Sequence, residues 1–263
     1  MIRSIVSIIT VIFALALPSA LRADDCTADN LTRVQGGNEC LVIKTFGKPS
    51  PHTKLIIFLH GDGSSGGPSD YMYPRAERFA ADGVVAIAMI RPGYFDSDGN
   101  HSSGKSWRKA GDGYRPVVVD AVAAAVKNLK AFHNAQTVIL VGHSGGAAIS
   151  AVILGRFPGL ADAAVLASCP CHVENWRIMR RGHNTWTESL SPHAFADAIP
   201  AATKVIALTG SRDSNTFPEI AQTYVEQLRQ RGLDARFIEV PGASHNGAAR
   251  SDQFYAAIAE LLQ

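Results

Sequence analysis

Aliphatic runs without polar alternation recur along the chain, and helix-like segments separate them. A strand that is buried on both faces has this pattern, which is typical of a parallel sheet. Strands are expected at residues 54–60, 84–90, 137–141, 163–168, 204–210 and 235–240, with an earlier one at 39–46 that could pair with 31–35. Helices are expected at 69–81, 115–132, from Ser144 to about 157, at 217–231 and at 251–262. This alternation predicts one mostly parallel central sheet with helices on both faces.

The first 23 residues differ from the rest. A positive start precedes an apolar core at 4–17 and small residues at 18–23, the pattern of a secretory signal peptide cleaved after Ala23 or Ala20. The apolar run is shorter than the roughly 20 residues that a membrane span needs, and the residues before Cys26 do not suit a lipid anchor. We expect an exported protein, periplasmic or secreted, with no stable membrane anchor and a single domain over residues 24–263.

The charge balance gives no sign of a nucleic-acid partner. The chain has 25 basic and 23 acidic side chains, and the excess equals Arg3 and Arg22 of the signal peptide. The remainder is balanced and has no basic tract. The sequence also predicts no cofactor and no metal site, because Cys169, Cys171 and His172 have no second cluster at metal-ligand spacing. The oligomeric state has no signature in the sequence.

Four cysteines allow three disulfide pairings, and export permits disulfides. We favour Cys26 with Cys40, which would tie down the N-terminal segment and stabilise the fold by about 3 kcal/mol. Cys169 and Cys171 could bridge across one proline, although that ring is tight, or either could pair with an N-terminal cysteine.

Residues 137–150, TVILVGHSGGAAIS, carry the strongest candidate for chemistry. A buried aliphatic run leads into Gly142, Ser144 and Gly146, and a small-residue helix follows at once. The glycines let strand and helix approach closely and let the turn take strained backbone angles. The Ser144 hydroxyl would then lie at the tip of a sharp corner, as in the nucleophile elbow G-x-S-x-G, with the strand-then-helix context that this motif requires.

A serine nucleophile needs an adjacent general base, which a third group orients. Asp213 and His245 follow the last two predicted strands. Either alone could be an ordinary turn or loop residue, but Ser144, Asp213 and His245 stand in the order nucleophile, acid, base of an α/β-hydrolase. Ligands bind at the carboxyl ends of parallel strands, so we predict that these three residues form a catalytic triad.

The anion that forms on a substrate carbonyl needs preorganised donors. One should be the backbone N–H of Gly145. The other should come from the glycine-rich loop at residues 60–63, where the N–H of Asp62 is the predicted donor and that of Gly63 the alternative. The same loop could also be a plain tight turn.

The segments HGDG, GHSGG, TGSRD and PGASHNG together resemble the α/β-hydrolase superfamily of serine hydrolases, from about residue 54 to the end. The resemblance implies the α/β-hydrolase fold. The compact size and the HGDG loop look like secreted esterases and the dienelactone-hydrolase or prolyl-oligopeptidase-like catalytic domains. Two features depart from these relatives: the chain lacks the large propeller of such oligopeptidases, and Ser144 stands where dienelactone hydrolases usually have Cys.

Two segments should decide the substrate, the polar loop at 94–114 and a small cap insertion at about 169–202. The insertion carries aromatic and basic residues, namely Trp176, Trp186, Phe195, Arg177, Arg180, Arg181 and His183. They could form an aromatic wall with a guanidinium for a substrate carboxylate. We favour instead an amphipathic helix with its aromatic residues in the core and its arginines solvated.

The expected function is an exported serine esterase that acts on small or medium carboxylic esters through an acyl-enzyme. An alternative is a serine peptidase or aminoacyl-amide hydrolase with the same triad. A third is a catalytically silent binding protein on this fold, since fold does not fix function. The intact triad and glycine-rich loop argue against the third. The expected partner is a small-molecule ester or a peptide.

Overall fold

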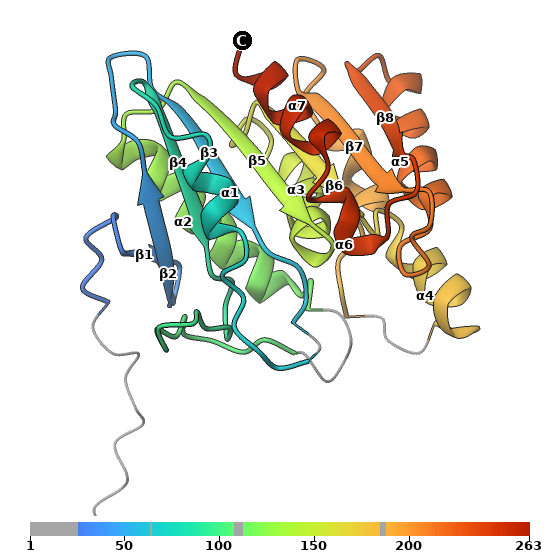
Figure 1. Ribbon diagram of the computed structural model, residues 1–263, viewed down its shortest axis with the longest axis horizontal. Helices are drawn as coiled ribbons and strands as arrows, with labels where there is room; N and C mark the ends of the chain where they lie inside the picture. The colour runs from blue at the N-terminus through green and yellow to red at the C-terminus, as the bar shows by residue number, and fades with distance from the viewer. Residues whose placement is uncertain (1–25, 64, 108–112, 185–187) are drawn as a thin grey trace, which may run out of the picture.

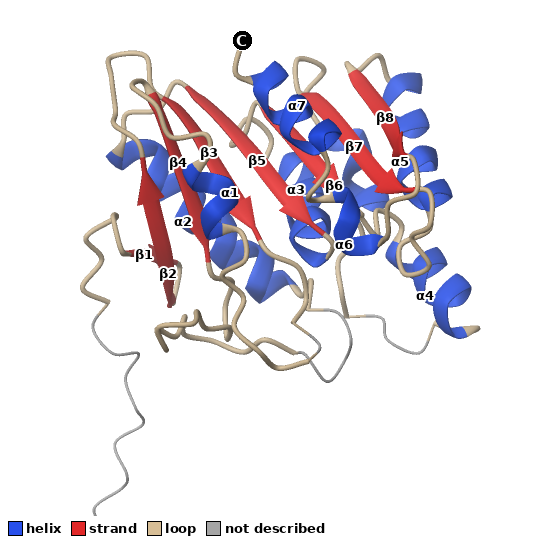
Figure 2. Cartoon of the chain, viewed as in Figure 1, coloured by secondary structure: helices blue, strands red, loops and turns tan. Residues whose placement is uncertain are grey.

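The computed structural model describes residues 26–63, 65–107, 113–184 and 188–263. The predicted signal peptide at residues 1–23 and Trp186 lie outside these residues. An eight-stranded sheet in the order β1-β2-β4-β3-β5-β6-β7-β8 forms the centre of the molecule. Helices cover both of its faces (Figure 1, Figure 2).

The strands are β1 (Arg33–Gly36), β2 (Glu39–Phe46), β3 (Lys54–Leu59), β4 (Val84–Met89), β5 (Thr137–His143), β6 (Ala163–Ala167), β7 (Lys204–Gly210) and β8 (Ala235–Val240). The described helices are α1 (Tyr73–Glu77), α2 (Pro116–Phe132), α3 (Gly145–Arg156), α4 (Val173–Arg181), the 3₁₀ helix η2 (Pro192–Ala198), α5 (Pro218–Gln230), α6 (His245–Ala248) and α7 (Asp252–Leu261). Most predicted elements agree with these bounds within one or two residues.

The sheet is parallel from β4 to β8 and antiparallel at its other edge. β2 pairs antiparallel with both β1 and β4, whereas β3, β5, β6, β7 and β8 join the sheet in parallel. The predicted mostly parallel sheet is thus confirmed. The carboxyl ends of its parallel strands meet at one edge of the sheet, where ligands bind in such folds.

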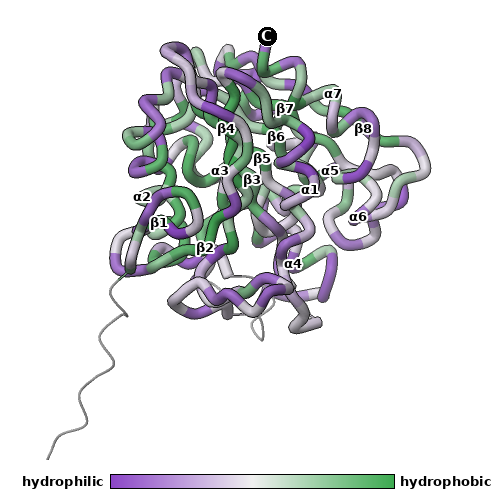
Figure 3. Tube along the Cα trace, turned by 60° about the vertical axis from the view of Figure 1, so that its left-hand side comes forward, coloured by the Kyte–Doolittle hydropathy of each residue, from purple (hydrophilic) through white to green (hydrophobic). Residues whose placement is uncertain are grey.

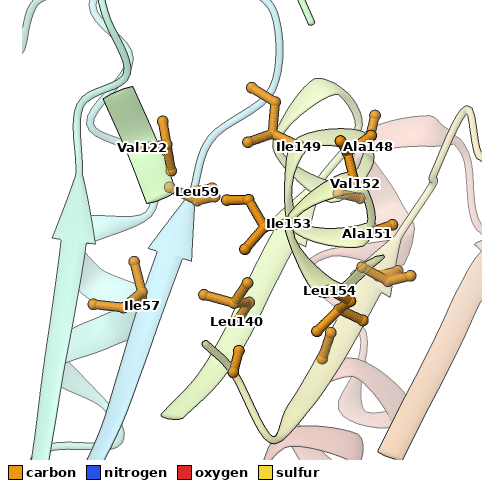
Figure 4. Close-up of a cluster of buried hydrophobic side chains, with 14 of the residues drawn as sticks. Ile57, Leu59, Val122, Leu140, Ala148, Ile149, Ala151, Val152, Ile153 and Leu154 are labelled. Carbon is orange, nitrogen blue, oxygen red and sulfur yellow. The ribbon is translucent and has the colours of Figure 1, made fainter. Parts of the chain in front are cut away.

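Each face of the sheet has its own hydrophobic core. Alternate side chains of β3 enter opposite cores: Leu55, Ile57 and Leu59 pack with α2, α3 and α5, whereas Ile56 and Phe58 pack with α1 and α7. Side chains alternate in this way because a strand has a period of two residues. In Figure 4, Ile153 of α3 lies between Leu59 of β3 and Leu140 of β5. Apolar residues accordingly concentrate in the central strands in Figure 3.

The helix predicted at residues 69–81 was wrong in extent, because α1 covers only Tyr73–Glu77. The residues before α1 form hydrogen bonds with distant parts of the chain. The N–H of Ser69 donates to Phe95 O, and the Tyr71 hydroxyl accepts from the N–H of Gly61. The residues after the helix turn toward β4, where Ala81 bridges to Val84. Long-range hydrogen bonds thus replace the first helical turn, whereas local turns follow the helix.

Residues 169–202 contain two helices with different neighbours. α4 lies at the carboxyl edge of the sheet, at the lower right of Figure 1. η2 packs instead against α3, where the backbone of Phe195 lies so close to Gly155 that a Cβ there would be 2.1 Å from Phe195 O. Phe195 therefore packs against the core beneath α3 rather than forming part of a wall over the elbow, and α4 is the part of the predicted insertion that borders the site.

Two disulfides are present, Cys26–Cys40, the favoured pair, and Cys169–Cys171. The first ties the described N-terminus to β2, and the second lies buried just after β6. Disulfides are compatible with an exported protein. Across the described ranges, no helix combines the length and apolar character that crossing a bilayer requires.

Candidate active site

Ser144 occupies a sharp corner between β5 and α3. Its backbone angles are φ 51° and ψ −119°, in a region that residues other than glycine rarely adopt. The N–H of Ser144 donates to Ala167 O on the neighbouring strand β6 at 2.8 Å, which fixes the corner to the sheet. Such strain persists only where the surrounding structure determines it, and it concentrates at functional sites.

Two glycines make this corner possible. A Cβ on Gly142 would lie 2.4 Å from the backbone N and Cα of Ala147, so α3 could not pass so close to β5. A Cβ on Gly146 would lie 2.2 Å from Leu59 O of β3. In both cases the obstacle is backbone, which cannot move aside as a flexible side chain can. The glycines of the motif are therefore required by close approach.

The structure brings Asp213 and His245 together. Asp213 follows β7, and His245 is the first residue of α6, after β8. His245 Nδ1 lies 2.9 Å from Asp213 Oδ2 and 3.2 Å from Oδ1. The carboxylate is fully buried, whereas the imidazole is 19% exposed and borders a cleft. This geometry would leave Nε2 of His245 for proton transfer.

Asp213 is held as a carboxylate by several donors. Burial raises its pKa, but hydrogen bonds from His245, from the Thr216 hydroxyl and from the N–H of Asn215 outweigh it and hold the pKa at about 2. Thr216 Oγ1 lies 2.8 Å from Asp213 Oδ2, and the N–H groups of Asn215 and Thr216 donate to Oδ1 at 2.9 Å. A charged Asp213 can orient the histidine and stabilise an imidazolium.

His143, beside the nucleophile, connects three parts of the site. The N–H of Gly61 donates to the Tyr71 hydroxyl at 2.6 Å, and that hydroxyl donates to His143 Nδ1 at 2.7 Å. His143 Nε2 in turn donates to the backbone oxygen of His245 at 3.2 Å. Burial lowers the pKa of His143 to about 3, with a further contribution from the charge of His245, so the ring is neutral near pH 7. One chain of hydrogen bonds therefore joins the glycine-rich loop, the elbow and α6.

The glycine-rich loop is anchored through the side chain of Asp62. Asp62 Oδ1 forms an ion pair with Arg91 Nη2 at 2.7 Å, and the Tyr114 hydroxyl donates to Oδ2 at 2.8 Å. Burial lowers the pKa of Arg91, but the Asp62 carboxylate, together with Tyr94 and Tyr114, raises it above its usual value, so the guanidinium stays charged. Arg91 also donates to His60 O at 2.9 Å. The loop is thus tied to the segment that follows β4.

The side chain of Asp62 packs against Gly145, the residue after the proposed nucleophile. A Cβ on Gly145 would lie 2.6 Å from both carboxylate oxygens of Asp62, so the loop crosses directly beside the start of α3. No residue of the described ranges accepts a hydrogen bond from the backbone N–H of Asp62, Gly63 or Gly145. The N-terminus of a helix also favours a negative charge. The N–H groups of Asp62, Gly63 and Gly145 therefore stay predicted donors to a developing anion.

The candidate residues line a cleft of about 690 Å³. Its lining includes Ser144, His143, His245, Asp62, Gly63, Tyr71, Tyr114, Trp176, Asn215 and four arginines, Arg75, Arg180, Arg181 and Arg250. The Ser144 hydroxyl forms no hydrogen bond with any described residue, while His245 Nε2 lies 3.3 Å from Asn215 Nδ2. Contacts between nucleophile and base are often loose in the absence of substrate.

Helix α4 agrees in part with the interpretation favoured on sequence. Trp176 is nearly buried, as expected for the core, and its indole N–H donates to Asn215 O at 2.9 Å. Arg180 and Arg181 are exposed but line the cleft beside Ser144 and His245 instead of pointing only to bulk solvent.

Several residues of the site carried no recognisable signal in the sequence. His143 is the first of the two variable positions of the G-x-S-x-G pattern, and Tyr71 follows the glycine-rich loop without any motif of its own. Thr216 and Asn215 could have been suspected only from their closeness to Asp213. Where the chain is described, no group of three or more His, Cys, Asp or Glu side chains is placed to hold a metal ion.

A model of the prolyl oligopeptidase family matches residues 75–263. These residues include Ser144, Asp213 and His245, whereas Asp62 and Gly63 precede them. No curated protein sequence matches the chain significantly.

Solved structures of similar fold are esterases and peptidases. Est1E of Butyrivibrio proteoclasticus, solved with ferulic acid bound, has a TM-score of 0.66 at 14% identity, over 88% of this chain and 97% of that one. The proline iminopeptidase of Mycobacterium smegmatis has a TM-score of 0.64 at 16% identity, over 88% and 96%. The acylaminoacyl peptidase of Pyrococcus horikoshii has a TM-score of 0.66 at 13% identity, over 87% of this chain and 40% of that longer one. These likenesses confirm the α/β-hydrolase fold.

Proposed function

Because the chain belongs to the prolyl oligopeptidase family and is a serine hydrolase, we propose that it cleaves carboxylic esters through an acyl-enzyme formed on Ser144. The observation that carries this proposal is the Asp213–His245 pair, 2.9 Å apart, in the same cleft as the strained Ser144 corner. Family membership and this arrangement argue against a silent binding protein.

In the proposed acylation, the Ser144 hydroxyl attacks the carbonyl carbon of the ester while His245 Nε2 takes its proton. Asp213 stabilises the resulting imidazolium. The carbonyl oxygen, now negative, accepts hydrogen bonds from the N–H groups of Gly145 and Asp62, with Gly63 as the alternative donor. When the tetrahedral intermediate collapses, the C–O bond to the alcohol breaks, and His245 gives the alcohol its proton.

Deacylation repeats these steps with water. His245 Nε2 takes a proton from water as its oxygen attacks the acyl carbon, and the same N–H groups hold the second oxyanion. The intermediate collapses to a carboxylic acid, and the proton returns to Ser144. No cofactor enters this proposal.

The charge of the cleft favours esters over substrates with a free amino terminus. Asp62 is the one carboxylate among the described lining residues, and it is paired with Arg91. A substrate ammonium would meet several guanidinium groups and no free carboxylate. Like charges at close range are unfavourable, so the cleft does not suit an aminopeptidase.

A serine peptidase that accepts blocked peptides or acylated amines remains the second candidate. The family match and the fold shared with the acylaminoacyl peptidase of Pyrococcus horikoshii favour it. Its substrates would carry no free ammonium at the acyl side, so the charge argument does not exclude them.

We also propose that the protein is exported. The signal-like pattern of residues 1–23 supports this proposal, and the disulfides Cys26–Cys40 and Cys169–Cys171 suit an oxidising compartment. A periplasmic or extracellular enzyme would meet small esters from the surroundings.

The test is a comparison of kcat/KM for p-nitrophenyl esters of increasing acyl length with that for an acylated aminoacyl-naphthylamide. Each substrate is also given to Ser144→Ala, in which we expect turnover to fall by about 10⁴-fold or more. Amide turnover equal to ester turnover would favour the peptidase. Ester turnover that survives in Ser144→Ala would refute the proposed nucleophile.

A further inference from the structure

The cleft has arginines on two sides of the proposed nucleophile. Arg180 and Arg181 come from the end of α4, while Arg75 belongs to α1 and Arg250 follows α6. In Figure 1, α4 and α1 lie on opposite sides of α6, which begins with His245. Helices that carry arginines of the cleft therefore lie on both sides of α6.

These charges are not neutralised within the described ranges. No described carboxylate lies within ion-pair distance of Arg180, Arg181 or Arg250. Surface arginines elsewhere do have such partners, such as Arg156 with Asp120 and Arg236 with Glu260. A concave site lined by one sign of charge attracts and concentrates ligands of the other sign.

The α4 arginines are oriented by neighbouring groups. Arg180 Nε donates to Asn215 Oδ1 at 2.9 Å, which leaves the terminal nitrogens of its guanidinium for another acceptor. The Arg181 guanidinium lies 5.6 Å from the centre of the Trp176 ring. Held arginine side chains lose less conformational entropy when they bind an anion than freely moving ones do.

Arg75 and Arg250 differ in the hydrogen bonds that they form within the protein. Arg75 Nε donates to Ala249 O at 2.9 Å, and the guanidinium also donates to Tyr71 O. Burial lowers the pKa of Arg75, and the positive charge of Arg250 lowers it further. Arg75 therefore acts as a fixed charge, and Arg250 is the available guanidinium on this side.

We propose that Arg180 and Arg181 bind a carboxylate of the substrate, while Arg250 adds to the positive charge of the cleft, so that the preferred ester carries a negative charge close to its scissile bond. This inference rests on the proposed function, because it names the substrate class of the same site. Guanidinium groups bind carboxylates through charge-assisted hydrogen bonds, often in pairs.

The position of Arg180 sets where the carboxylate lies. Asn215 contacts Arg180 through Oδ1 and His245 through Nδ2, at 2.9 and 3.3 Å. One side chain thus separates the guanidinium from the proposed base. The carboxylate would then lie a few bonds from the scissile carbonyl, as in half-esters of short dicarboxylic acids.

The test measures kcat/KM for mono-p-nitrophenyl glutarate and for its neutral isostere, in which a terminal amide replaces the carboxylate. We expect the wild type to prefer the anionic ester by about tenfold or more at low salt, and the preference to shrink as ionic strength rises. In Arg180→Gln the ratio of the two kcat/KM values should fall by about tenfold. Arg180→Lys, which keeps the charge but not the planar fork, should lose less.

The matched control is Lys127→Gln, which removes one positive charge from the exposed side of α2, away from the cleft. In this variant, the ratio of kcat/KM for the anionic ester to that for the neutral ester should equal the wild-type ratio. A wild-type ratio near one, or a ratio that none of Arg180→Gln, Arg181→Gln and Arg250→Gln changes, would overturn the proposal.

A second measurement does not depend on turnover. Glutarate should raise the thermal transition of Ser144→Ala at millimolar concentration, and glutaramide should not. If neither ester is hydrolysed but glutarate raises the thermal transition, the proposed function fails while the carboxylate site stands. If the esters are hydrolysed equally and glutarate does not protect, the carboxylate site fails while the function stands. Protection by inorganic phosphate alone would overturn the assignment to a carboxylate.

Discussion

At the scale of single residues, His143 shows how a buried neutral imidazole can organise an active site. Its two nitrogens have different tasks, since Nδ1 accepts from Tyr71 and Nε2 donates to the backbone of His245. A protonated ring could not accept from Tyr71. The arrangement therefore holds only while His143 is neutral, which its pKa of about 3 ensures at ordinary pH.

The same shift predicts a pH dependence of stability. The pKa of His143 is about 3 in the folded protein and about 6.5 in the unfolded chain. Below pH 6.5 the unfolded chain therefore binds a proton that the folded one does not, and stability falls as the pH decreases toward 3. His143 should account for about 2 kcal/mol of the loss between pH 7 and pH 5.

Urea unfolding of the wild type and of His143→Gln at pH 7 and pH 5 measures this contribution. The variant should start less stable because it loses hydrogen bonds, but it should lose about 2 kcal/mol less between the two pH values. An equal loss in both proteins would show that His143 is not the titrating group.

The three catalytic candidates could be predicted from the sequence, but the residues that hold them in position could not. Ser144, Asp213 and His245 stand at strand ends in a recognisable order, so their closeness could be predicted. Tyr71 lies 72 residues from its partner His143, and no local pattern encodes that contact. Such contacts arise only when the sheet places distant segments side by side.

At the scale of elements, the close approach of α3 to β5 and β3 makes the elbow. The approach depends on Gly142, whose added Cβ would collide with the backbone of Ala147. We expect Gly142→Ala to lower the free energy of unfolding by about 2 kcal/mol, since a strained interior cannot absorb an extra methyl group at this distance.

Gly67→Ala is the matched control. Gly67 has an ordinary φ and no atom within 4 Å of its would-be Cβ, so the change should alter stability by less than about 1 kcal/mol. Urea unfolding of both variants compares the two positions. A loss in Gly67→Ala as large as that in Gly142→Ala would contradict the close-approach argument.

Elements with strong local signals were predictable, and those fixed by tertiary contacts were not. The buried aliphatic runs of β3 and β5 can be recognised as strands from the sequence alone. The helix at 69–81 was overestimated because its first residues bind distant partners and its last ones form local turns. The arginines of α4 were expected to face solvent because most charged helical faces do. The fold places this face at the cleft.

At the scale of the whole molecule, the disulfide Cys26–Cys40 fastens the described N-terminus to the antiparallel edge of the sheet. The two cysteines are 14 residues apart. A link of this loop length reduces the conformational freedom of the unfolded chain, and it should stabilise the fold by about 3 kcal/mol.

The double variant Cys26→Ser, Cys40→Ser should therefore unfold at a lower urea concentration than the oxidised wild type, with a free energy lower by about 3 kcal/mol. Its kcat/KM should remain close to that of the wild type, because the cleft is built at the carboxyl ends of the parallel strands. A stability difference below about 1 kcal/mol would mean that the hairpin of β1 and β2 is held by its packing.

The overall architecture followed from the alternation of strands and helices, because connection rules leave few topologies for that pattern. The position of α4 beside Ser144 and the pairing of Cys169 with Cys171 did not follow. Both depend on how the segment after β6 folds back, and its mixed composition has no period that selects one path.

The far edge of the sheet is the strand β8, which has a paired neighbour on one side only. Arg236 and Glu239 interrupt its apolar residues, and Arg236 is bound to Glu260 of α7. Charged side chains on an edge strand hinder its pairing with a strand of another molecule. A concentrated solution of this enzyme should therefore resist aggregation through sheet extension, and an engineer seeking greater solubility should leave these two charges in place.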